Sequence, residues 1–211
     1  MSETLPNQSA ALARVQDYLE KSSERVLIGI IGKPGAGKST LSKFLTSKFP
    51  KEFVTVVPMD GYHLSNKVLK DLGRSERKGA PDTFDVLGFV SLVKRIRSEQ
   101  TQDIYYPIFD RAIEESIAAQ GVVTSATKVV IIEGNYLLHD SGGWEILNDL
   151  LDESWLVDVD DDKRIARLIQ RHIAFGKDPV AAKAWAKGTD EANAQLIERG
   201  RPRADFIIQT D

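Results

Sequence analysis

The sequence predicts an α/β domain with a mostly parallel central sheet. Short apolar runs rich in β-branched residues indicate strands at 26–31, 53–57, 129–132, 155–159 and 206–208. Segments with apolar residues at helical spacing alternate with these strands, which is typical of parallel βαβ units. Because the alternation continues along all 211 residues, we expect a single domain that spans 1–211.

This domain has three expected parts, namely an N-terminal helical segment (1–24), a core (25–160) and a lid with the C-terminal helices (161–200). A run of three aspartates, 160–162, is suited to cap the first lid helix, and 178–200 is expected to be helical. The aromatic segment 104–111 contains a proline, which indicates a sheet edge or a strand end.

Composition excludes several classes of protein. The chain has no cysteine, so disulfides, thiolate nucleophiles and cysteine-based zinc sites are excluded. A net charge of -3 with interspersed signs argues against a general nucleic-acid partner. No apolar run approaches the roughly 20 residues of a membrane helix, so we expect no membrane partner. The first residues lack the pattern of a signal peptide, so we expect a cytoplasmic protein.

One stretch organises the chemistry. It matches the pattern G-x-x-x-x-G-K-[ST] between a strand and a helix, and consists of Gly32, Lys33, Pro34, Gly35, Ala36, Gly37, Lys38, Ser39 and Thr40. In such a loop the backbone N–H groups hold a di- or triphosphate, and the glycines allow the curled backbone. We therefore expect Lys38 to bind the β- and γ-phosphates, Ser39 to face Mg²⁺, and Thr40 to lie near the α-phosphate.

Two carboxylates follow strands on the same side of the expected sheet. Asp60 comes just after the strand at 53–57, and Glu133 directly follows the strand at 129–132. In open α/β sheets ligands bind at the carboxyl ends of the strands, so both acids should face the phosphate loop. Asp60 is the better candidate for a base that accepts a hydroxyl proton, and Glu133 for orienting the metal's water molecules. The two roles can be exchanged between them.

Positive charge gathers in two further segments. In the lid helix, Arg164, Arg167 and Arg171 are expected to share one face, and Ile165, Leu168, Ile169 and His172 the other. These arginines either pair with surface carboxylates or cover the transferring phosphate. The basic segment 67–78 is either a solvated loop or a flap over the substrate. The histidines are too scattered for a metal site, and His63 is a candidate for the substrate pocket.

The sequence resembles a known family at these same positions. It resembles the P-loop kinases that include uridine kinase, phosphoribulokinase and bacterial pantothenate kinase. The stretches that carry the resemblance are the phosphate loop, Met59-Asp60-Gly61-Tyr62-His63, Asn66-Lys67-Val68-Leu69, Lys78-Gly79-Ala80-Pro81, Phe84-Asp85 and Glu133-Gly134. The sequence resembles still more closely the small bacterial members named as fructose transport system kinases. The resemblance covers most of 25–211 and implies a three-layer P-loop NTPase fold with a five-stranded parallel sheet and a helical lid.

The resemblance also implies a chemistry. ATP is the expected phosphate donor and Mg²⁺ its metal, with Ser39 and Glu133 as metal residues. Lys38, Asp60, Glu133, Arg167 and Arg171 are the expected catalytic residues. The expected acceptor-binding residues are Asp60, Tyr62, His63, Tyr106 and Arg111. Two departures weaken particular acceptors: only about 30 residues precede the phosphate loop, unlike in pantothenate kinases, and no histidine follows Pro107-Ile108-Phe109-Asp110-Arg111 as it does in uridine kinases.

We therefore predict an ATP-dependent kinase that phosphorylates a hydroxyl of a small metabolite, such as a sugar like fructose, a nucleoside or a pantothenate-like alcohol. The alternative is a nucleotide-binding regulatory ATPase or switch without a small acceptor. A guanine-type switch is disfavoured because Asn66-Lys67-Val68-Leu69 has leucine where the base-binding aspartate belongs. Monomer and homodimer both stay open.

Overall fold

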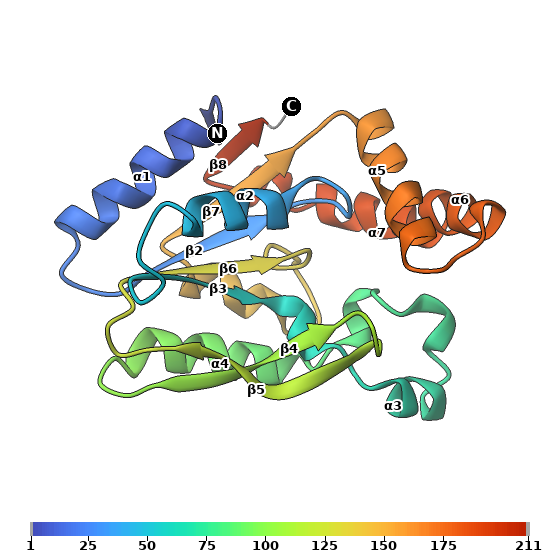
Figure 1. The fold of residues 1–211 in the computed structure, drawn as a ribbon, viewed down its shortest axis with the longest axis horizontal. Helices are drawn as coiled ribbons and strands as arrows, with labels where there is room; N and C mark the ends of the chain where they lie inside the picture. The colour runs from blue at the N-terminus through green and yellow to red at the C-terminus, as the bar shows by residue number, and fades with distance from the viewer. Residues whose placement is uncertain (1, 210–211) are drawn as a thin grey trace.

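The computed structural model describes residues 2–209. Its centre is a parallel sheet of six strands in the order β1-β8-β7-β2-β6-β3 (Figure 1). In that order the strands are Glu3–Leu5, Phe206–Gln209, Glu153–Asp158, Val26–Ile31, Val129–Gly134 and Val54–Pro58. The α/β class and the five expected strands are confirmed. The sixth, β1, was not expected, because three residues without a β-branched run give no strand pattern and its place is fixed by backbone pairing with β8.

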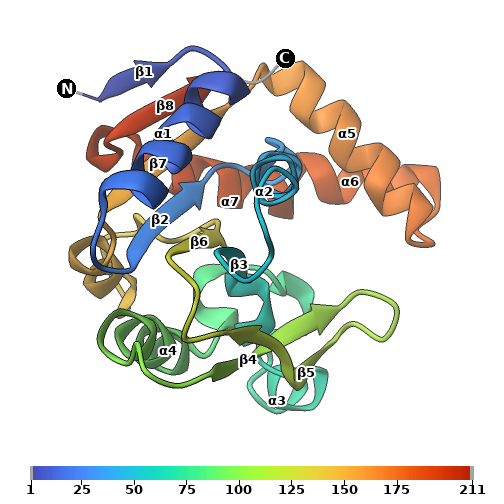
Figure 2. The same cartoon turned by 60° about the vertical axis from the view of Figure 1, so that its left-hand side comes forward.

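Helices cover both faces of this sheet, so the domain has three layers. Helices α1 (Gln8–Lys21) and α2 (Lys38–Thr46) lie on one face, and α4 (Val86–Ser98) with the 3₁₀ helix η4 (Trp144–Leu150) on the other (Figures 1 and 2). Side chains of β2 alternate between the two cores: Ile28 faces the first and Leu27 the second. The central strand is buried on both faces, as parallel sheets require.

A β-hairpin stands apart from this sheet. It consists of β4 (Ile104–Asp110) and β5 (Glu115–Val123), which pair antiparallel with a register shift at Pro107. The segment 104–111 is therefore a strand, as expected, but of a separate sheet. The hairpin's backbone presses on the 3₁₀ helix η1 (Met59–Tyr62), where a Cβ on Gly61 would lie 2.0 Å from the carbonyl oxygen of Pro107.

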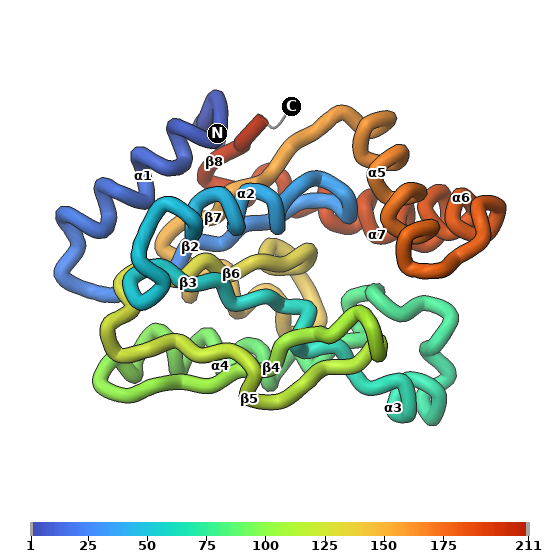
Figure 3. The backbone as a smooth tube through the Cα atoms, viewed as in Figure 1, coloured from blue at the N-terminus to red at the C-terminus, as the bar shows by residue number. Residues whose placement is uncertain are grey.

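A long excursion follows η1. It contains α3 (Asn66–Asp71) and the short 3₁₀ helices η2 (Ser75–Arg77) and η3 (Pro81–Thr83), and it extends away from the sheet beside the hairpin (Figure 3). Two hydrogen bonds tie it there, since the backbone and side-chain nitrogens of Asn66 donate to the tip of the hairpin at Glu115 and Glu114.

The segment expected to form a lid contains α5 (Asp161–Ala174), α6 (Pro179–Lys187) and α7 (Thr189–Glu198), and we keep the name lid for these helices. The short η5 (Arg201–Arg203) leads into β8. As expected, Asp160 caps α5 through its side chain. The helical stretch expected at 178–200 is two helices, because Gly188 leaves the helical conformation with φ of -103° and ψ of -92°. Within the described part of the chain, no helix has the length and apolar character needed to cross a bilayer.

Candidate active site

The phosphate loop connects the central strand β2 to α2. Gly35 and Gly37 have φ of 82° and 99°, a left-handed conformation that favours glycine. At Gly35 space is also limiting, because a Cβ would lie 2.8 Å from the carbonyl oxygen of Arg164 in α5. The two glycines let the chain curl before α2 begins at Lys38, so the free N–H groups of the helix start point into the loop.

Lys38 lies folded over this loop. Its Nζ donates to the carbonyl oxygens of Gly32 at 2.8 Å and Lys33 at 3.3 Å. Burial lowers the pKa of Lys38 to about 8, although the carboxylates of Glu133 and Asp60 act in the opposite direction. An anion bound in the loop would therefore stabilise the protonated form of this amine.

Ser39 and Glu133 form the next contact. The Ser39 hydroxyl donates to Glu133 Oε1 at 2.5 Å. Strand register explains the meeting, since Glu133 pairs with Ile30 of β2 and Pro58 of β3, at the carboxyl edge of the sheet. A hydroxyl and a carboxylate side by side next to a phosphate loop are hard oxygen ligands of the kind that Mg²⁺ prefers, so these residues fit the metal expected from the sequence.

Asp60 lines a cavity together with Arg171 of α5. It follows β3 in η1, and its Oδ2 accepts a hydrogen bond from Arg111 Nη2 at 2.9 Å. Arg111 comes from the turn of the β4–β5 hairpin, so the close contact between Gly61 and Pro107 positions both partners. His63, three residues on, donates from Nδ1 to the carbonyl oxygen of Asp60 at 2.8 Å, and burial lowers its pKa.

Two cavities flank this group of residues. The larger, of about 660 Å³, extends along the phosphate loop and the start of α2, and we call it the phosphate cavity; its lining includes Gly35, Gly37, Lys38, Ser39, Thr40 and Arg167. The other, of about 370 Å³, lies beyond Asp60 and is the acceptor cavity; its lining includes Asp60, His63, Lys78, Phe109, Lys177 and Asp190. Arg111, Arg171 and Phe175 line both, so the cavities adjoin at these three residues.

Two residues expected at the acceptor are not brought to it. Tyr62 turns away from Asp60 and packs on Phe89 of α4, with ring centroids 5.2 Å apart. Tyr106 is 5% exposed and donates its hydroxyl to the carbonyl oxygen of Val56 at 2.7 Å. Neither side chain lines a cavity described above. Both belong to the packing between the sheet, α4 and the hairpin.

The lid arginines divide differently from the expectation. Arg164 is fully buried on the face that holds Leu168, whereas Arg167 is exposed. Positions 164, 168 and 171 are spaced at i, i+4 and i+7, so the face toward the protein carries Arg171 as well. Arg171 lines both cavities, and burial together with the nearby Arg111 lowers its pKa. Arg167 lines the phosphate cavity only.

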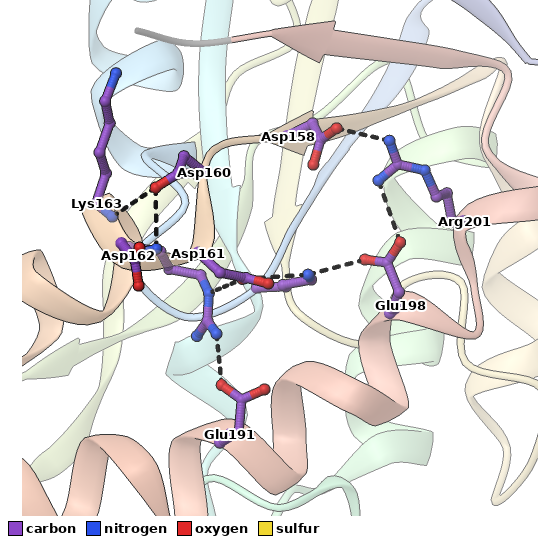
Figure 4. Close-up of polar contacts among 10 residues, drawn as sticks. Asp158, Asp160, Asp161, Asp162, Lys163, Glu191, Glu198 and Arg201 are labelled. Carbon is purple, nitrogen blue, oxygen red and sulfur yellow. Dashed lines mark hydrogen bonds and ion pairs between the residues drawn. The ribbon is translucent and has the colours of Figure 1, made fainter.

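A network of charges joins the lid to the phosphate loop, and Figure 4 shows its acids Asp161, Glu191 and Glu198. Arg164 is one of its cations. It pairs with Asp161 at 2.8 Å and with Glu191 of α7 at 2.5 Å. Lys33 of the phosphate loop pairs with Asp161 at 3.4 Å and Glu198 at 3.2 Å. The arginines thus divide: Arg164 pairs with carboxylates, and Arg167 and Arg171 line cavities.

The basic segment 67–78 is largely neutralised. Arg77 pairs with Asp82 at 2.6 Å, Arg74 with the same carboxylate at 3.5 Å, and Lys67 with Asp71 at 3.3 Å. Lys78 differs in that it lines the acceptor cavity. Most of the charge in this segment is therefore paired at the surface, and its last residue lines the acceptor cavity.

Sequence reasoning missed several residues of the acceptor cavity: Asn135, Phe175, Lys177, Trp185, Asp190 and Asn193. Five of them come from lid helices or their connections, and helical spacing alone does not say which lid residue faces the sheet. His172 was expected on the core side of α5; it is half-buried, donates from Nε2 to Asp190 Oδ2 at 2.7 Å and lines the cavity. A polar pair buried between two helices leaves no local sequence signal.

Several known proteins are similar to this chain in sequence and in fold. The model of the "Phosphoribulokinase / Uridine kinase family" matches residues 27–210. A fission-yeast protein named "Putative uridine kinase C227.14" (Schizosaccharomyces pombe) is 32% identical over 201 residues, which are 90% of this chain and 86% of that protein. A crystal structure described as "putative fructose transport system kinase" from Silicibacter sp. TM1040 is 40% identical, with a TM-score of 0.85 over 95% of this chain and 98% of that chain.

YFH7 from Saccharomyces cerevisiae, described as a P-loop containing kinase with a circular permutation, has the same fold at 18% identity, with a TM-score of 0.82 over 97% of this chain and 99% of that one. The family model spans nearly the whole chain, including the phosphate loop, Asp60, Glu133 and the lid. The chain therefore belongs to the phosphoribulokinase and uridine kinase family and is an ATP-dependent phosphotransferase.

Proposed function

We propose that this protein transfers the γ-phosphate of Mg²⁺-ATP to a hydroxyl of a small metabolite bound in the acceptor cavity. One observation carries the proposal: the phosphate cavity and the acceptor cavity adjoin at two arginines, and Asp60 lines the acceptor side of that junction. A donor phosphate on one side and an alcohol on the other can thus meet in line, which is the main requirement of phosphoryl transfer.

Each chemical requirement has a candidate residue. The acceptor oxygen bonds to the γ-phosphorus while the bond from that phosphorus to the β–γ bridging oxygen breaks, and ADP leaves with the electron pair. Asp60 takes the proton of the acceptor hydroxyl, which later passes to solvent. Lys38, Arg111 and Arg171 neutralise charge on the phosphoryl group, and Arg167 does so from the lid.

Ser39 and Glu133 would hold Mg²⁺ beside the β- and γ-phosphates, Ser39 directly and Glu133 through water. The hydrogen bond between them supports this assignment, because it brings two hard oxygen ligands together at the start of α2. The metal supplies charge neutralisation to the phosphates and orients them for transfer.

A transfer assay tests the proposal. ATP labelled at the γ-phosphate is mixed with the protein and with nucleosides, pantothenate, ketohexoses and hydroxy acids, and the labelled products are separated. We expect label in one acceptor class and ADP in equal amount. Label that appears only as inorganic phosphate, at a rate that no acceptor raises, contradicts an acceptor kinase and favours the regulatory ATPase.

A further inference from the structure

The acceptor cavity is lined by four basic side chains: Lys78, Arg111, Arg171 and Lys177. Three acidic residues, Asp60, Glu114 and Asp190, line the same cavity. Each of the three acids already has a partner. Asp60 pairs with Arg111 at 2.9 Å, Glu114 with Lys78 at 3.6 Å, and Asp190 accepts from His172 at 2.7 Å. Asp60 and Glu114 thus pair with Arg111 and Lys78, and Arg171 and Lys177 are the two remaining basic side chains of this cavity.

Lys78 is already engaged within the protein. Its Nζ donates to Asn66 Oδ1 at 2.7 Å and to the carbonyl oxygen of Glu114 at 2.7 Å, and it forms an ion pair with the Glu114 carboxylate at 3.6 Å. Two of the three N–H donors of the ammonium are thus used, and the carboxylate compensates its charge. Lys78 therefore fastens the excursion after η1 to the hairpin, and its charge is compensated.

Arg171 and Lys177, unlike Lys78, have no carboxylate within ion-pair distance among the described residues, 2–209. Arg171 lines both cavities and so serves the transferring phosphate, whereas Lys177 lines the acceptor cavity alone. An uncompensated cation at the far side of a cavity is stabilised by an anionic ligand.

The position of Lys177 is built into the lid. Gly176, with φ of 93°, reverses the chain at the end of α5, and the N–H of Lys177 donates back to the carbonyl oxygen of His172 at 3.0 Å. The Lys177 Nζ then lies 4.5 Å from the ring centroid of Trp185 in α6. An aromatic face attracts an ammonium without neutralising it or using up its hydrogen-bond donors.

We propose that the acceptor is a hydroxylated small molecule with an anionic group, a carboxylate or a phosphate ester, and that Lys177 binds this group. The inference rests on the proposed kinase function and deepens it. In this arrangement the hydroxyl lies toward Asp60 and the anion toward Lys177, which both line the acceptor cavity. The acceptor cavity has a volume of about 370 Å³, which is within the range for pockets that bind small metabolites.

Matched pairs of acceptors test the proposal. Glycerate and glycerol, gluconate and glucitol, pantothenate and pantothenol, and fructose 6-phosphate and fructose differ in charge within each pair. We expect the anionic member to be phosphorylated with the higher kcat/KM, and the carboxylate and phosphate arms identify which anion is used. Equal or better use of the neutral members overturns the proposal and leaves the kinase function intact.

The substitution Lys177→Met separates the role of this side chain from general effects. We expect KM for the anionic acceptor to rise about 10- to 100-fold, the range for one hydrogen bond to a charged group, with KM for ATP unchanged. Lys183→Met is the matched control, because Lys183 is exposed on the adjoining helix and lies outside both cavities. An unchanged KM in Lys177→Met contradicts the proposal.

A binding titration decides the proposal even without turnover. The same acceptor pairs are titrated into the protein loaded with Mg²⁺ and a non-hydrolysable ATP analogue, with and without Lys177→Met. Tighter binding of an anionic member, lost in the variant, supports the subsite. Binding that does not depend on the charge of the acceptor overturns it, whether or not label is transferred.

Discussion

Arg111 Nη2 and Asp60 Oδ2 lie 2.9 Å apart, and this ion pair joins the turn of the hairpin to the end of strand β3. Both side chains are partly exposed to the acceptor cavity, and Arg111 also lines the phosphate cavity. The contact keeps the carboxylate at the junction of the two cavities. A hairpin outside the main sheet therefore completes the site that the parallel strands begin.

The affinity for ATP should fall in alkaline solution because of Lys38. In the ATP-free protein its pKa is about 8, lowered by burial, and bound phosphate favours the charged amine. Below pH 8 the amine is already protonated, so the dissociation constant for ATP is at its lowest value. Above pH 8 binding must first add a proton, so the dissociation constant should rise about tenfold per pH unit. Calorimetric titrations from pH 6.5 to 9.5 measure this. Lys38→Met should bind weakly at every pH, and a wild-type affinity that stays constant to pH 9.5 contradicts the assignment.

Ser39→Ala and Glu133→Gln should raise the Mg²⁺ concentration needed for half-maximal activity, because each removes a hard oxygen from the expected metal site. An increase of about tenfold is typical for residues that hold or orient metal ligands. Activity at a series of Mg²⁺ concentrations measures the shift. Ser91→Ala, an exposed serine of α4, is the control and should behave as wild type. If Asp60→Asn moves the Mg²⁺ dependence and Glu133→Gln does not, the two acids have exchanged roles.

Gly61→Ala should lower both stability and activity. Its Cβ would lie 2.0 Å from the carbonyl oxygen of Pro107, so the hairpin must move and take Arg111 away from Asp60. Overpacking of this kind costs about 1–3 kcal/mol of unfolding free energy. Urea denaturation and the transfer assay measure the two effects. Gly73→Ala is the comparison: there φ is +65° and nothing lies within 4 Å, so it should cost about 1 kcal/mol of left-handed strain and keep full activity.

Arg164→Met should destabilise the domain by about 2 kcal/mol. The guanidinium is fully buried and links Asp161 to Glu191, and its loss leaves both acids without their main partner. The acids are 55% and 33% exposed, so solvent reduces the penalty below that of a fully buried pair. Urea midpoints measure the change, with the exposed neighbour Lys163→Met as control. Equal midpoints for the two variants would show that the network does not stabilise the lid.

Part of the candidate site follows from local sequence. A strand, a glycine loop and a helix fix Lys38 and Ser39, and the rule that strand ends face the ligand brings Glu133 beside Ser39. Such features depend on short stretches and on parallel pairing. They are therefore visible in the residue pattern.

Other parts depend on contacts between distant segments. Tyr62 and Asp60 are two residues apart in a 3₁₀ helix, and only the packing of Phe89 decides which of them faces the core. The strand β5 has a polar, small-residue sequence and forms because β4 offers it a partner. In α5, the expected face for Arg164 was wrong because that side chain turns into the interior to pair with Glu191 of α7 as well as with Asp161 of its own helix.

The most direct test of the account follows labelled γ-phosphate in a single turnover with wild-type protein and Asp60→Asn, using an acceptor that the wild type phosphorylates. The account predicts transfer to the acceptor in wild type, and in the variant a rate lower by about 10²- to 10⁴-fold with ATP binding within twofold of wild type, because only proton acceptance is lost. Asp71→Asn, an exposed carboxylate of α3, should transfer at the wild-type rate. Equal rates of acceptor phosphorylation in wild type and Asp60→Asn would contradict the central claim.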